Sequence, residues 1–163
     1  MIRPARDTDR AAIAAIQLES WRDAYAGALP ETFLQDELPG ILDQRWQGAL
    51  LGPPNITLIA YEDAPLAFAS VVDRTPPHLE NLHTRPAARS TGIGRRLMAD
   101  VARRLIERDQ EALTLEVLAS NGRARAFYAR LGGEEGPPFE DSHYGHKVQA
   151  VPVLFPDLEA LTR

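Results

Sequence analysis

The chain has 163 residues, of which 44% are hydrophobic and 25% charged, and its formal net charge is −5. These values are typical of one globular domain with its own core, so we expect a single domain over residues 1–163. The absence of cysteine excludes disulfides, a thiol nucleophile and zinc–cysteine sites. An acidic chain without a basic block is not expected to bind nucleic acid.

Hydropathy along the chain gives no sign of a membrane protein. The first nine residues lack the apolar core of a signal peptide, and no stretch approaches the roughly 20 apolar residues of a membrane span. We therefore expect a cytoplasmic protein that does not bind membranes.

The first half of the chain contains apolar residues at helical or alternating spacing, separated by Pro and Gly. In order, the expected elements are a strand over residues 2–6, a helix from Asp7 or Thr8 to about Tyr25, a helical stretch from Pro30, a helix over 41–50, a hairpin of strands 56–61 and 66–72, and a strand over 78–84. Because Pro39 and Gly40 break helices, we expect them to separate the second and third helices.

The second half begins with a loop that runs directly into an amphipathic helix. The expected elements are the loop 86–94, a helix with Ile93, Leu97, Val101 and Leu105 on one face, a strand over 113–117, a helix from Asn121 to Gly132, a proline-rich loop over 136–141, and an edge or bulged strand over 148–155 containing Pro152. The order predicts an α/β fold in which helices flank a mixed sheet.

Residues 89–96, RSTGIGRR, lie between a predicted strand and the amphipathic helix. Glycines let an anion approach the unpaired N–H groups of a helix's first turn, and three arginines add positive charge. The loop therefore suits a pyrophosphate, although a tight turn with solvated arginines has the same pattern.

A second motif follows in residues 113–133, LTLEVLASNGRARAFYARLGG. With RSTGIG, which matches the (Q/R)xxGx(G/A) acyl-CoA loop, it resembles the GCN5-related N-acetyltransferases (GNAT), most strongly over residues 79–133. The resemblance implies a mostly antiparallel mixed sheet and direct acetyl transfer from acetyl-CoA to an amine. It implies a cofactor site made of Leu82, His83, Thr84, Arg89, Ser90, Thr91, Gly92, Ile93, Gly94, Arg95 and Asn121.

The resemblance also suggests catalytic groups. Tyr128 would protonate the leaving thiolate, and the alternative is that it packs in a core. The attacking amine must first lose a proton, because an ammonium of pKa about 10.4 is almost fully charged at pH 7. Glu116 is narrowly favoured as the base, Glu80 is its rival, and water could replace either. Asn121 suits a helix N-cap whether or not it binds ligand.

The residues around His143 offer a candidate acceptor wall. His143 and His146 lack a third ligand cluster, so we expect no metal. We expect this loop, with Tyr144, to wall the acceptor pocket beside Trp21 and Tyr25.

A small-molecule primary amine is the preferred acceptor. The alternatives are a protein N-terminus of the ribosomal-protein type, or a non-catalytic acyl-CoA sensor. A nucleotide-binding domain has only the glycine loop in its favour. The last apolar run, residues 148–155, could reach a second subunit in a homodimer.

Overall fold

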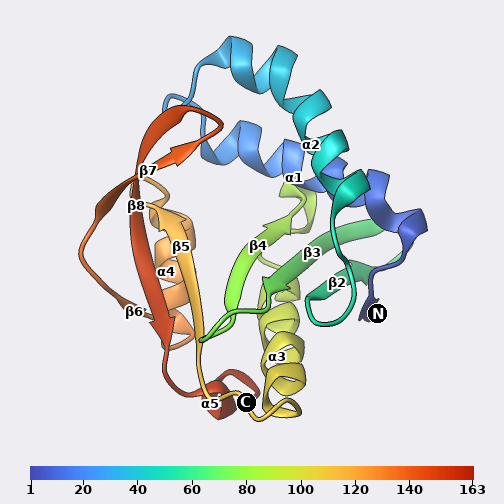
Figure 1. The fold of residues 1–163 in the computed structure, drawn as a ribbon, viewed down its shortest axis with the longest axis vertical. Coiled ribbons are helices and arrows are strands. Elements are labelled where there is room, and N and C mark those ends of the chain that lie inside the picture. Colours follow the sequence, from blue (N-terminus) through green and yellow to red (C-terminus); the bar gives the residue numbers. More distant parts are fainter.

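The computed structural model describes all residues from 1 to 163, and its centre is one mixed sheet of eight strands (Figure 1). The strands run in the order β1-β2-β3-β4-β5-β8-β6, and β7 also pairs with β8. Only β4 and β5 are parallel neighbours. The strands are β1 (Ile2–Pro4), β2 (Ile56–Tyr61), β3 (Pro65–Val72), β4 (His78–Thr84), β5 (Leu113–Leu118), β6 (Glu134–Glu135), β7 (Phe139–His143) and β8 (His146–Phe155). The predicted fold class is confirmed.

Helices cover both faces of the sheet because successive strand residues point to opposite sides. On β3, Ala67 and Ala69 belong to the core beneath α3 (Ile93–Ile106), whereas Phe68 belongs to the core beneath α1 (Arg10–Ala24) and α2 (Leu38–Gly48). No helix combines the length and apolarity needed to cross a bilayer. The remaining α-helices are α4 (Gly122–Arg130), which was predicted, and the short α5 (Leu158–Leu161). The sequence reasoning missed α5.

The two parallel strands separate soon after they meet. β4 pairs with β5 through His78 and Leu79 only. Glu80 is then an extra residue on β4, because consecutive residues of β3 face Leu79 and Asn81. Such a β-bulge bends a strand and increases its twist. Beyond it, β4 and β5 diverge (Figure 1), and side chains of both strands line a cavity between them.

The predicted break at Pro39 and Gly40 is wrong. A π-helical turn, η2 (Phe33–Glu37), continues directly into α2. The N–H of Leu38 donates to the carbonyl of Phe33, five residues earlier. Pro39 stands in the first turn of α2 and cannot donate to the turn before it, but Arg22 of α1 donates to the carbonyls of Leu34 and Gln35 in that turn at 3.1 and 3.3 Å. The helical path therefore tolerates the proline.

The predicted loop over residues 136–141 is partly wrong, because Phe139 begins strand β7. Tyr144 and Gly145 join β7 to β8 with φ values of 50° and 83°, the positive values of a two-residue hairpin turn. Pro152 faces the interruption between β6 and β7, where its carbonyl accepts a 2.9 Å bond from the N–H of Gly136. The backbone of Pro152 faces this interruption, so its missing N–H removes no hydrogen bond between β8 and β6 or β7.

Candidate active site

Two cavities adjoin where β4 and β5 diverge. The first, which we call the acidic cavity, has a volume of about 430 Å³, and the second, the glycine-loop cavity, about 340 Å³. Both contain residues of α1, β4 and α4, so they meet at one place. The residues that line both are Ser20, Ala24, Leu82, Asn121, Ala124 and Tyr128. We call this meeting place the junction.

The glycine-loop cavity lies at the start of α3. Gly92 is the N-cap residue with a φ of +80°, a value that glycine adopts without strain. The first helical N–H with a carbonyl partner is that of Arg96, which donates to Gly92 at 3.1 Å. The preceding N–H groups of this turn have no partner in the protein. A Cβ on Gly94 would lie 3.2 Å from the ring of Phe127, so glycine lets α3 approach α4 closely.

Arginines surround this cavity. Asp23 of α1 binds Arg89 at 2.6 Å and Arg123 at 3.2 Å, and the Arg89 hydrogen bond lowers the pKa of the Asp23 carboxyl. One guanidinium nitrogen of Arg95 donates to the carbonyl of Arg163 at 2.9 Å. The sequence reasoning did not single out Asp23, which lies outside both motifs, or Arg123, which lies within the second motif. The exposed N–H groups and the arginines together suit an anionic ligand.

Nine of the eleven predicted cofactor residues line the glycine-loop cavity. The two exceptions are His83, whose side chain lines the acidic cavity, and Thr91. The Thr91 hydroxyl donates to the carbonyl of Ala88 at 2.7 Å within the loop. The side chains of these two residues therefore lie outside the glycine-loop cavity, and the contacts that the resemblance implies for them are those of their backbone groups.

Asn121, the N-cap residue of α4, and Tyr128 within that helix stand at the junction. The Asn121 side chain accepts a 3.2 Å bond from the N–H of Ala124, as expected of an N-cap. The Tyr128 ring packs edgewise on Phe127 and Phe155, and its hydroxyl has no hydrogen-bond partner in the protein. Burial raises the pKa of Tyr128, so its hydroxyl remains protonated well above neutral pH.

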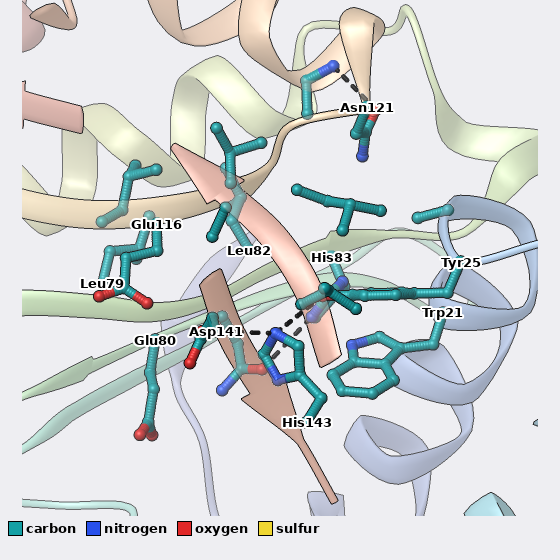
Figure 2. Close-up of a pocket in the computed structure, with 18 of the residues that line it drawn as sticks. Trp21, Tyr25, Leu79, Glu80, Leu82, His83, Glu116, Asn121, Asp141 and His143 are labelled. Carbon is teal, nitrogen blue, oxygen red and sulfur yellow. Dashed lines mark hydrogen bonds and ion pairs between the residues drawn. The ribbon is translucent and has the colours of Figure 1, made fainter. Parts of the chain in front are cut away.

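Three carboxylates line the acidic cavity, and Figure 2 shows Glu80, Glu116 and Asp141 around it. Arg45 binds Glu80 at 3.0 Å. Neither Glu116 nor Asp141 forms an ion pair with Arg or Lys. Burial, and then the negative charge of Asp141, raise the pKa of the Glu116 carboxyl, against a smaller opposing effect of Arg74. Of the two predicted bases, Glu116 is therefore the one without an Arg or Lys partner.

Aromatic side chains form the opposite wall, where Figure 2 shows Trp21 of α1 and Tyr25, the C-cap residue of that helix, beside His143. The Tyr25 hydroxyl lies 3.4 Å from Nε2 of His143, and this nitrogen lies 3.7 Å from Asp141. The ring centroids of Trp21 and Tyr144 are 5.9 Å apart. Burial, with the charge of Asp141, raises the pKa of Tyr25 to about 12. The predicted packing of the His143 segment on the first helix is confirmed.

Sequence reasoning missed Asp141 and Ser20 at this site. Asp141 fell in the segment predicted as loop, because the residue types of Phe139–His143 (FEDSH) show no alternation of apolar and polar side chains that would predict a strand. Ser20 belongs to a helix without a motif, so only the packing of α1 against β4 brings it to the junction.

Comparisons with known proteins agree with this geometry. The model of the acetyltransferase (GNAT) family matches residues 15–133. The chain is 29% identical to the uncharacterized N-acetyltransferase YhfO of Bacillus subtilis over 149 residues, which are 91% of this chain and 98% of the relative.

Solved structures show the same fold. The PaiA N-acetyltransferase of Thermoplasma acidophilum, in complex with coenzyme A, has a TM-score of 0.76 at 17% identity, over 93% of this chain and 96% of that chain. The ribosomal-protein-S18-alanine N-acetyltransferase of Escherichia coli has a TM-score of 0.67 at 24% identity, over 96% of this chain and 93% of that chain. The prediction of an N-acetyltransferase with acetyl-CoA as co-substrate is confirmed at the level of the family. The chain belongs to the GNAT family of acetyltransferases.

Proposed function

We propose that this enzyme transfers the acetyl group of acetyl-CoA directly to a primary amine of a small molecule. The observation that carries the proposal is the pair of adjoining cavities. One is built for an anion, the other presents carboxylates and aromatic rings, and the two share the residues of the junction. A thioester entering through one cavity would thus meet an amine held in the other.

In this proposal the co-substrate occupies the glycine-loop cavity. The free N–H groups at the start of α3 bind the pyrophosphate, with Arg89, Arg95 and Arg123 nearby. The pantetheine arm then follows the exposed edge of β4, where Leu82 and Thr84 line the cavity, and Asn121 stands at its inner end. This route follows from the divergence of β4 and β5, which leaves backbone groups of β4 without a parallel partner.

The acidic cavity fits a small cationic acceptor. Its volume of about 430 Å³ lies within the range typical of small-molecule sites, about 300–1,000 Å³. Glu116 and Asp141 offer negative charge without an Arg or Lys partner, and the rings of Trp21 and Tyr25 offer apolar contact. The β7–β8 hairpin packs on α1 through His143 and Tyr144, which closes this end of the cavity against a long extended chain.

The reaction that these groups support is direct transfer. Glu116 takes a proton from the bound ammonium, directly or through water, and the freed nitrogen attacks the thioester carbonyl. The C–N bond forms, the C–S bond breaks, and Tyr128 gives its proton to the departing thiolate. The nitrogen then loses its second proton, which restores the phenol of Tyr128 through water, and Glu116 releases the first proton to solvent. The products are the acetylated amine and coenzyme A thiol.

A panel of acceptors tests the small-molecule assignment. Release of coenzyme A thiol is measured with small primary amines and with peptides that differ in their free N-terminal residue. We expect the best small amine to exceed the best peptide in kcat/KM by at least about tenfold. The opposite ranking would support a protein N-terminal acetyltransferase, the activity in the name of the E. coli structure. Tight acetyl-CoA binding without any acceptor would instead indicate a sensor.

Replacing Glu116 by Gln is expected to lower acceptor kcat/KM at pH 7 by about 10- to 100-fold. Without the base, the reaction depends on the small fraction of free amine, so the deficit should shrink as pH rises toward the acceptor pKa. The measurement is kcat/KM for the acceptor between pH 6 and 10.

The matched control is Glu80→Gln, because Glu80 lines the same cavity but is held by Arg45. We expect its pH profile to follow the wild type. If Glu80→Gln lowers acceptor kcat/KM at pH 7 more than Glu116→Gln does, Glu80 is the base instead.

A further inference from the structure

A chain of four polar side chains runs beneath the acidic cavity and ends at the junction. Oγ of Ser20 lies 2.9 Å from Nδ1 of His83, and Nε2 of His83 lies 3.3 Å from Oδ1 of Asn81. Nδ2 of Asn81 donates to Oγ of Ser70 at 2.9 Å. Asn81 and Ser70 are buried, at 5% and 6% exposure. The chain links α1 to β4 and β3.

The hydrogen bonds of Asn81 set the direction of the whole chain. Because its amide nitrogen faces Ser70, its carbonyl oxygen faces His83, and an oxygen can only accept there. Nε2 of His83 therefore carries the ring hydrogen, and Nδ1 presents a lone pair. The Ser20 hydroxyl must donate to that lone pair.

His83 is well placed to hold the hydroxyl in this way. Its ring packs on Phe68, with centroids 5.5 Å apart, and its two nitrogens are both engaged. Burial lowers the pKa of His83 to about 3, so the ring is neutral and keeps its lone pair at neutral pH. The hydroxyl hydrogen of Ser20 is thus donated to Nδ1 of His83, and the lone pairs of Oγ have no hydrogen-bond donor in the protein.

Ser20 is one of the few residues that line both cavities, and Tyr128 and Asn121 are others. An attacking primary amine has one lone pair for the carbonyl carbon and two N–H groups to be placed. Glu116 lines the acidic cavity but not the glycine-loop cavity, so it can meet the amine from one side only.

We propose that Oγ of Ser20 accepts a hydrogen bond from the attacking amine and orients its lone pair toward the thioester. His83 is a positioning residue that acts through Ser20. The inference rests on the proposed transfer to an amine, and it adds a specificity-determining group to that site. A primary amine can satisfy both Glu116 and Ser20 during attack, whereas its N-methyl analogue has one N–H fewer.

The first test is Ser20→Ala. We expect acceptor kcat/KM to fall by about tenfold, the effect of one lost hydrogen bond of ordinary strength, while acetyl-CoA affinity measured by calorimetry stays within twofold. We also expect the variant to lose part of the wild type's preference for a primary amine over its N-methyl analogue.

The second test is a double-mutant cycle with His83→Gln, which keeps hydrogen-bonding capacity in the buried chain. Because His83 acts through the hydroxyl, this substitution should lower acceptor kcat/KM in the wild type and change it little in Ser20→Ala. Thr114→Val is the matched control, since the Thr114 hydroxyl lies 2.9 Å from Nδ1 of His78 but does not line either cavity. Its kinetics should equal those of the wild type.

Two outcomes overturn the inference. One is a Ser20→Ala enzyme with acceptor kcat/KM and amine preference equal to the wild type. The other is a fully additive cycle, which would mean that His83 acts independently of Ser20. Failure of the proposed function looks different, because the wild type itself would then acetylate no small amine.

Discussion

Replacing Tyr128 by Phe is expected to lower kcat by about 100-fold or more, while acetyl-CoA affinity changes little. The phenol lies at the junction without a protein partner, and burial raises its pKa, so it holds a proton ready for the leaving thiolate. Phe keeps the ring that packs on Phe127 and Phe155. The measurement is kcat at saturating substrates, with calorimetric titration of acetyl-CoA.

The matched control is Tyr25→Phe, which also removes one hydroxyl and keeps one ring. Tyr25 lines only the acidic cavity, where its hydroxyl lies 3.4 Å from His143. We expect this change to alter acceptor KM more than kcat. If Tyr128→Phe keeps kcat within threefold of the wild type when chemistry limits the rate, Tyr128 is not the acid.

The largest expected effect on stability comes from Asp9. This carboxylate is only 2% exposed and accepts bonds from two nitrogens of Arg3 at 2.7 and 3.0 Å, from the N–H of Arg6 at 2.8 Å and from the Tyr61 hydroxyl at 2.9 Å. Asp9→Ala leaves these donors without their acceptor, so we expect unfolding free energy to fall by about 3 kcal/mol. The corresponding decrease in Tm is roughly 6–12 °C.

The same carboxylate predicts a pH dependence. The Arg3 hydrogen bonds, with those of Arg6 and Tyr61, lower the pKa of Asp9 from 3.8 to about 2. A lowered folded-state pKa contributes stability above the unfolded value, and that contribution is lost as pH falls from about 3.8 to 2. We expect the wild type to lose about 2 kcal/mol over this window through Asp9, and Asp9→Ala to lack that loss.

Urea unfolding at pH 7 and across the acid range measures both effects. Asp7→Asn is the control, because the Asp7 side chain is 88% exposed although it lies in the same turn, so its urea midpoint should match the wild type. An Asp9→Ala protein with the wild-type midpoint would show that these hydrogen bonds contribute nothing net to stability.

Local sequence patterns were sufficient to predict the helix and the loop that border the glycine-loop cavity. The apolar spacing from Ile93 to Leu105 defines α3, and the glycines before it define the loop. Asn121 acts as the cap that its residue type predicts. These elements depend on residues close together in the chain, which is why one sequence was enough.

The acceptor side depends on contacts that no local pattern records. β7 is a polar strand preceded by Pro137 and Pro138, and its turn places Tyr144, an uncommon residue for positive φ, beside Gly145. Asp141 approaches Glu116 only because this strand forms. Likewise, Pro39 was expected to end a helix because the widened turn before it cannot be recognised from residue types alone.

The short contact between β4 and β5 divides the backbone hydrogen bonding of the sheet into two ladders. One contains β1 to β4 and the other β5 to β8, and two residue pairs join them. Backbone hydrogen bonds therefore join the two ladders at two residue pairs only, and elsewhere the ladders are held together by side chains of the core beneath α3. A molecule bound in the acidic cavity contacts both ladders, because residues of β4 and β5 line this cavity. Its binding therefore raises the free energy of local unfolding for both ladders. Occupancy of the acidic cavity would therefore connect the two halves of the sheet, and we expect backbone amide exchange to slow in both halves when this cavity is filled.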